Sequence, residues 1–121
     1  MPLTPGSWTY DEQRLQASFG TGAASFALRC DRQNRQVQLL RPGVTTGNVM
    51  RVQTTETTRG FPLSITPDSS ATPYVNLSAL DPLLDGIAFS RGRFSVEVPG
   101  LPTMIMPAWP EPARVVEECR G

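Results

Sequence analysis

The residues that could do chemistry gather in one stretch, "DPLLDGIAFSRGRFSVEV", which covers positions 81–98. It contains two carboxylates four positions apart, Asp81 and Asp85, followed by the segment "SRGR" at positions 90–93. Carboxylates one helical turn apart can act as a general acid and base. Guanidinium groups bind carboxylates and phosphates through paired hydrogen bonds. The stretch therefore suggests an acid pair, an anion site, or a helix that leads into a strand.

For the two carboxylates we favour a structural role. Asp81 is suited to cap a helix, because its side chain can accept hydrogen bonds from the free amides of the first turn. Pro82 follows at the first helical position, where a missing N–H costs nothing. A carboxylate such as Asp85 near the start of a helix is stabilised by the helix dipole. We expect a short helix at about residues 82–90, ended by a left-handed Gly92, and no catalytic residue.

Four residues are the candidates for ligand binding: Ser90, Arg91, Arg93 and Trp109. The arginines suit an anion, but they could equally stabilise the end of the helix or form local ion pairs, for example with Glu97. Trp109 could line a pocket or a partner surface, or it could close one end of a small core. The arginines are the stronger of these candidates.

The composition excludes several classes of site. The chain contains no His, which rules out Ser–His–Asp and Cys–His catalysis and His-based zinc sites within one chain. Eleven basic residues balance eleven acidic ones, so no net field attracts nucleic acid. Gly20-x-Gly22 lacks the third glycine of a dinucleotide site, because Ser25 stands there. We expect no metal, no cofactor and no nucleic-acid partner.

The two cysteines, Cys30 and Cys119, are far apart in the sequence. A bridge between them would close a loop of about 90 residues, which stabilises a fold by roughly 4–5 kcal/mol in the chain-entropy model. Two separate buried thiols are the alternative. No Cys-x-x-Cys pattern is present, so we do not expect a redox-active pair.

The hydrophobic pattern predicts a mainly β protein. Runs such as "RLQASF" and "QVQLL" alternate with a period of two, and the segment "PEPARVVEEC" predicts a C-terminal helix at about residues 110–119. In "TMIM" the inward pair is either Thr103 with Ile105 or Met104 with Met106. We expect one domain over residues 1–121, an antiparallel β-sandwich or flattened barrel, with residues 1–6 as a flexible N-terminal remnant.

No apolar run approaches the ~20 residues needed to cross a bilayer, so we expect no transmembrane segment. The start "MPLTPGSW" shows no signal peptide, and it could be the beginning of a mature chain from which an export signal has been removed.

Three segments carry a resemblance to a known family: "CDRQNRQVQLLRPG", "LDPLLDGIAFSRGRFSVEVPGLPTMIMPAWPE" and "ARVVEECRG". They resemble a family of small exported proteins of unknown function in alphaproteobacteria, mainly sphingomonads. The layout is also similar, more remotely, to periplasmic β-sandwich proteins of the invasion-associated locus B type. The resemblance implies an export signal or lipid anchor upstream, a periplasmic or envelope location, and a Cys30–Cys119 bridge. It implies no activity.

These observations lead to three hypotheses of function. We expect a non-enzymatic envelope protein that binds a protein partner or a small anionic ligand. One alternative is a periplasmic inhibitor of a hydrolase, which would present "SRGR" or "PGLP" to an active site. Another is an enzyme that uses Asp, Glu, Arg or Ser without His. An exposed strand edge could also support a homodimer.

Overall fold

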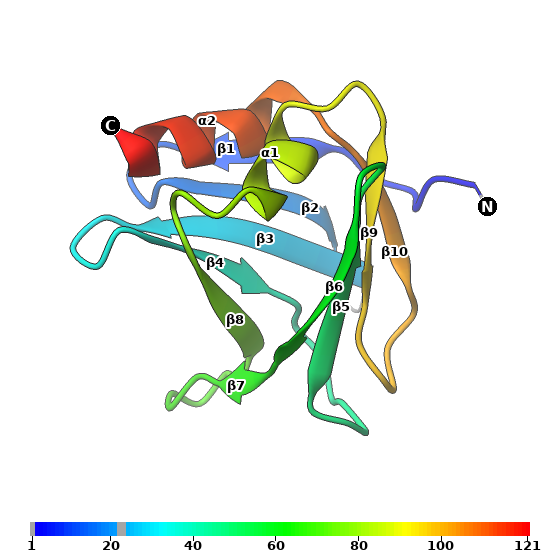
Figure 1. Cartoon of the computed structure of the whole chain (residues 1–121). Helices are drawn as coiled ribbons and strands as arrows, with labels where there is room; N and C mark the ends of the chain where they lie inside the picture. The colour runs from blue at the N-terminus through cyan, green and yellow to red at the C-terminus, as the bar shows by residue number, and fades with distance from the viewer. Residues whose placement is uncertain (1, 22–23) are drawn as a thin grey trace.

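The computed structural model describes residues 2–21 and 24–121, which form two antiparallel sheets and two helices (Figure 1). The six-stranded sheet has the order β1-β2-β3-β4-β8-β7, and the four-stranded sheet has the order β10-β9-β5-β6. The elements are β1 (Trp8–Asp11), β2 (Gln16–Thr21), β3 (Ala24–Asp31), β4 (Gln36–Leu40), β5 (Val49–Gln53), β6 (Thr58–Pro62), β7 (Ser64–Ile65), β8 (Pro73–Ser78), α1 (Leu83–Ala88), β9 (Arg93–Glu97), β10 (Met104–Pro107) and α2 (Pro110–Arg120). The expected mainly β sandwich is confirmed.

The core lies between the two sheets and is built by the period-two pattern. Each strand turns alternate side chains inward, because successive side chains of a strand point to opposite faces. In β10 the buried pair is Met104 and Met106, while Ile105 is half-buried on the outer face, which resolves the two possibilities left by the sequence. A cluster of aromatic rings fills the core beside β1, and the ring centres of Trp8 and Phe19 lie 5.2 Å apart.

The segment "RGFPLSI" forms two strands in different sheets. β6 belongs to the four-stranded sheet and β7 to the six-stranded sheet, and the chain changes sheet at Leu63. Pro62 has no N–H to donate, which suits the end of an edge strand. Because the chain bends here, Ile65 does not share the inward face of Phe61: its side chain is 50% exposed.

Both helices occur where the sequence places them, with small differences at their ends. α1 is shorter than the expected 82–90, and α2 extends one residue beyond the expected 110–119. Gly92 has no positive φ, so the expected left-handed cap is wrong. The reason is that the chain runs from Gly92 straight into β9, and the Gly92 carbonyl accepts a hydrogen bond from the Ala108 N–H at 3.2 Å.

The bridge between Cys30 and Cys119 is present and joins β3 to α2, with 5.5 Å between the two Cα atoms. α2 packs on the six-stranded sheet and on α1 (Figure 1). Its buried side chains include Val115 and Val116, one helical turn before Cys119. The disulfide therefore holds the C-terminal helix on the strands that its apolar face covers.

Arg41 joins the two sheets at the end of β4. Its side chain is fully buried, and its guanidinium N–H groups donate to the carbonyls of Ser25 at 3.2 Å, Pro42 at 3.1 Å and Pro102 at 3.0 Å. Burial lowers the pKa of Arg41 below its ordinary value. Pro102 lies in the turn between β9 and β10, so this one side chain fixes that turn against the six-stranded sheet.

The segment before β1 covers the outer edge of β10. The Thr4 N–H donates to the Ile105 carbonyl and the Ile105 N–H donates to the Thr4 hydroxyl, both at 2.8 Å. The indole N–H of Trp8 donates to the Pro107 carbonyl at 2.9 Å. Thr4 belongs to the segment 1–6 that we expected to be flexible, and its bonds leave β10 without an open edge along Ile105.

Removing the disulfide tests how much the docked helix depends on it. We expect replacement of both Cys30 and Cys119 by Ala to lower the free energy of unfolding by about 3–5 kcal/mol, because the unfolded chain regains the entropy of a long open loop. Urea unfolding followed by circular dichroism measures this loss. An unchanged midpoint, or two reactive thiols in the denatured unreduced wild type, would contradict the bridge.

Candidate functional site

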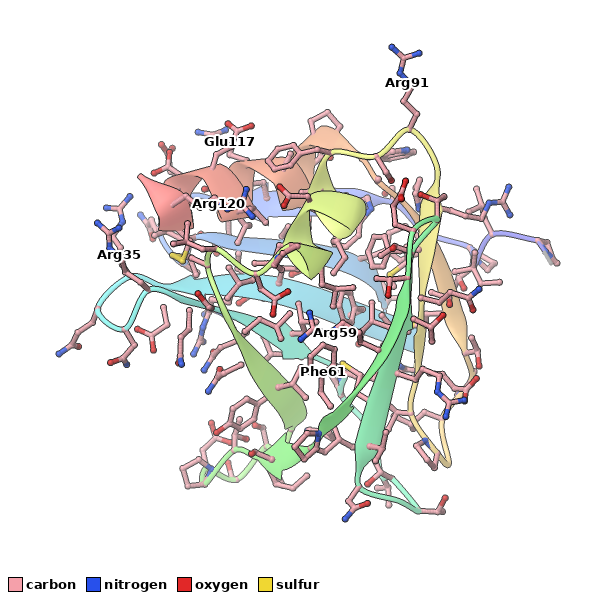
Figure 2. The ribbon with its side chains drawn as sticks, viewed as in Figure 1. Arg35, Arg59, Phe61, Arg91, Glu117 and Arg120 are labelled. Carbon is pink, nitrogen blue, oxygen red and sulfur yellow. A yellow bond between two sulfur atoms is a disulfide. The ribbon has the colours of Figure 1, made fainter. Side chains whose placement is uncertain are left out.

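The structure separates the residues of the "SRGR" segment. Arg93, the first residue of β9, lines an open hollow of about 550 Å³ on the four-stranded sheet. Arg91 projects from the loop into solvent (Figure 2). The hydroxyl oxygen of Ser90 is buried and has no hydrogen-bond partner among the described residues. Of these three residues the hollow therefore contains Arg93 alone.

Side chains from three neighbouring strands meet in the hollow. In the register of the sheet, Ser95 of β9 stands between Gln53 of β5 and Ile105 of β10. An amide, a hydroxyl and one apolar side chain thus form a row across the outer face, next to Arg93. The residues that line the hollow are Gln53, Thr54, Thr55, Arg93, Phe94, Ser95, Glu97, Thr103 and Ile105.

The charges of the hollow lie at its two ends. Arg93 and Glu97 are four residues apart on β9, which is about 13 Å along a strand. Glu97 pairs with Arg51 of β5 at 3.7 Å, and the two residues are partners in the sheet register. Arg51 thus balances the carboxylate at one end of the hollow, and the guanidinium of Arg93 stands at the other end.

Trp109 and Gly92 lie beside the hollow rather than in it. Trp109, the residue before α2, is 43% exposed. The Ala108–Gly92 hydrogen bond places it next to the "SRGR" loop. A Cβ atom on Gly92 would lie 3.0 Å from the Thr55 methyl group, so glycine allows the loop to pass close to the rim formed by Thr55.

The acid pair of the sequence has a structural role. One carboxylate oxygen of Asp81 accepts from the Leu83 N–H at 2.9 Å and from Arg59 of β6 at 2.6 Å. Asp85 pairs with Arg120 of α2 at 2.8 Å. Burial alone would raise the pKa of Asp81, but the hydrogen bonds from Arg59 and Leu83 and the charge of Arg59 outweigh it and lower the pKa. A carboxylate held ionised in this way is poorly suited to act as a general acid.

A second hollow of about 510 Å³ lies beside the disulfide and has both signs of charge. It is lined by Arg32, Arg35, Glu117, Glu118, Cys119 and Gly121. Arg32 pairs with Glu118 at 2.7 Å. Figure 2 shows Arg35 and Glu117 near the end of α2. Since two carboxylates accompany the two arginines, this hollow favours an anion less than the one at Arg93.

The pH dependence of stability tests the role of Asp81. Because its folded pKa is lowered, its contribution is present above the ordinary value of 3.8 and is lost as the pH falls below that value. We expect Asp81→Asn, which can still cap the helix, to lower stability at pH 7 by about 1 kcal/mol.

Urea unfolding of both proteins between about pH 7 and pH 2 measures the difference in free energy. We expect this difference to shrink in acid. Asp31 and Asp68, whose pKa values are also lowered, titrate in both proteins and cancel in the comparison. A difference that stays constant with pH would contradict this role for the Asp81 charge.

In the described part of the chain, no cluster of three or more His, Cys, Asp or Glu side chains could bind a metal. Neither of the helices in residues 2–21 and 24–121 has the length and apolar character needed to cross a membrane. Comparisons of the chain with protein-family models, with curated proteins and with solved structures found no match.

Proposed function

We propose that the protein is a non-enzymatic binding protein of the cell envelope, and that it binds a small anionic ligand in the hollow at Arg93. The observation that carries the proposal is the position of Arg93 beside the hydroxyl of Ser95 and the amide of Gln53. A guanidinium group binds a carboxylate or phosphate through two hydrogen bonds, and the neighbouring polar groups can bind the rest of the ligand.

The lining indicates which features the ligand needs. Its anionic group would pair with Arg93, and its hydroxyl or amide groups would contact Gln53 and Ser95. An apolar part would rest on Ile105, which is half-buried in the lining. A carboxylate or phosphate attached to a short polar carbon skeleton meets these needs better than a bare ion, because pockets orient ligands by a few polar groups.

Two observations support a location in the envelope. The Cys30–Cys119 bridge is of a kind that persists in oxidising compartments such as the bacterial periplasm. The resemblance to small exported proteins of alphaproteobacteria agrees with this, and we propose membership of that family. An export signal or lipid anchor upstream of this chain belongs to the same proposal.

A second candidate function rests on Arg91. This side chain projects into solvent and has no ion pair or hydrogen bond among the described residues (Figure 2). The "PGLP" turn, in contrast to Arg91, is hydrogen-bonded to the rest of the protein. Arg41 donates to the Pro102 carbonyl, and the Thr46 N–H donates to the Pro99 carbonyl at 2.9 Å. If the protein inhibits a periplasmic hydrolase, the "SRGR" loop is the segment that would enter the active site.

Two single substitutions separate these functions. We expect Arg93→Gln to weaken binding of inorganic phosphate or citrate at least tenfold in calorimetric titration, because a charge-assisted hydrogen bond is lost. Arg91→Gln, the matched control two residues before Arg93, should leave that affinity within about twofold.

Equal affinity of the wild type and Arg93→Gln for both ions would overturn the anion site. For the inhibitor, the readout is the rate of a hydrolase retained from envelope extract. Inhibition that Arg91→Gln abolishes and Arg93→Gln preserves would favour that function. If the extract yields no hydrolase that the wild type slows, the inhibitor candidate fails.

A further inference from the structure

β6 is the end strand of the four-stranded sheet (Figure 1), and no other strand of residues 2–21 and 24–121 pairs with its outer edge. Two hydrogen bonds continue the β5–β6 ladder at its two ends and show which backbone groups of β6 face β5. The Thr54 N–H donates to the Thr57 carbonyl and the Leu63 N–H donates to the Asn48 carbonyl, both at 2.8 Å. Hydrogen-bonded pairs alternate along an antiparallel ladder.

It follows from this alternation that the backbone N–H and carbonyl groups of residues 57, 59, 61 and 63 face β5. The backbone groups of Thr58, Gly60 and Pro62 point to the open edge instead. All three residues are exposed. Thr58 and Gly60 each present an N–H and a carbonyl, and Pro62 presents a carbonyl alone, so the edge offers two donors and three acceptors.

Among the described residues, neither the backbone conformation of Gly60 nor its surroundings require glycine. Its φ is not in the left-handed region, and an added Cβ would only reach ordinary contact with the Val49 side chain, at 3.5 Å. Glycine weakens a strand, and a close approach by another backbone is one of the reasons for which a strand contains it. The open edge and this glycine therefore both suit the pairing of another strand with β6.

Exposed apolar side chains occur in the segments next to β6. Val49, which is 40% exposed, stands opposite Pro62 in the register, and Ile65, 50% exposed, follows in β7. Leu80 is 73% exposed and precedes Asp81, whose carboxylate binds Arg59 of β6. A partner docked along β6 could cover apolar area as well as pair with the backbone.

We propose that a second copy of this chain docks on β6, antiparallel, with a two-fold axis at Gly60. Gly60 then donates to and accepts from Gly60 of the partner subunit. The Thr58 N–H donates to the carbonyl of Pro62 of the partner subunit, which needs no donor from that proline. The arrangement is isologous, so each contact occurs twice, and the four-stranded sheet becomes an eight-stranded one.

The side chains favour a second copy over an unrelated peptide. In this register Arg59 stands opposite Phe61 of the partner subunit, on the face where both side chains lie (Figure 2). Within one chain the Arg59 guanidinium already lies 4.8 Å from the centre of the Phe61 ring. The same cation–π contact is therefore available across the axis, twice, between residues that both copies provide.

The dimer is tested by sedimentation velocity between about 1 µM and about 1 mM, a range that detects weak and tight association. We expect the wild type to shift from 13.2 kDa to twice that mass as the concentration rises. Gly60→Pro should remain a folded monomer, because the N–H it removes faces away from β5. Gly60→Ala, the matched control, keeps the N–H and should still dimerise.

A wild type that stays monomeric at every concentration would overturn the proposal, as would a Gly60→Pro dimer as strong as that of the wild type. If Gly60→Pro fails to fold, amide exchange in the wild type decides instead. Exchange at Thr58 and Gly60 should slow at least tenfold on going from dilute to concentrated protein. Equal exchange rates at both concentrations would reject the β6 interface.

Discussion

A fully buried arginine, Arg41, ties the turn between β9 and β10 to the six-stranded sheet. Arg41 keeps its charge inside the protein because the carbonyls of three segments accept its N–H groups. One of these carbonyls belongs to Pro102, the residue before Thr103, which lines the hollow. The turn between β9 and β10 is thus fixed from the opposite sheet, and with it the strand that carries Arg93. The geometry of the candidate site depends on a residue that does not line it.

The other end of the sandwich is held covalently. The disulfide fixes α2 on the six-stranded sheet, and Arg120 of α2 reaches Asp85 of α1 and the Ala79 carbonyl. Asp81 in turn binds Arg59 of β6. These links form a chain from the C-terminal helix to the edge strand of the other sheet. Arg41, Arg59 and Arg120 therefore each join elements that are far apart in the sequence.

The sequence predicts the local features of this structure well and the long-range ones poorly. Alternation located the strands, and Asp81 and Pro82 marked the start of the short helix that forms α1. Nothing in one sequence pairs β5 with β9, so the neighbours of Arg93 in the hollow, Gln53 and Thr55, were missed. Arg41 was missed because a charged residue before Pro-Gly is typical of an exposed turn. Arg91 and Arg93 looked equivalent, since only the direction of the chain at Gly92 separates them.

The proposed binding of a small anion at Arg93 can be observed residue by residue in solution. Titration of the ¹⁵N-labelled protein with citrate, followed in nuclear magnetic resonance spectra, reports each amide and guanidinium N–H separately. We predict saturable shifts in the Arg93 side chain, the Gln53 side-chain amide and the Ser95 backbone, with Arg41 unmoved. Shifts confined to Arg32 and Arg35 beside the disulfide, or no saturable shift in any residue, would contradict an anion site at Arg93.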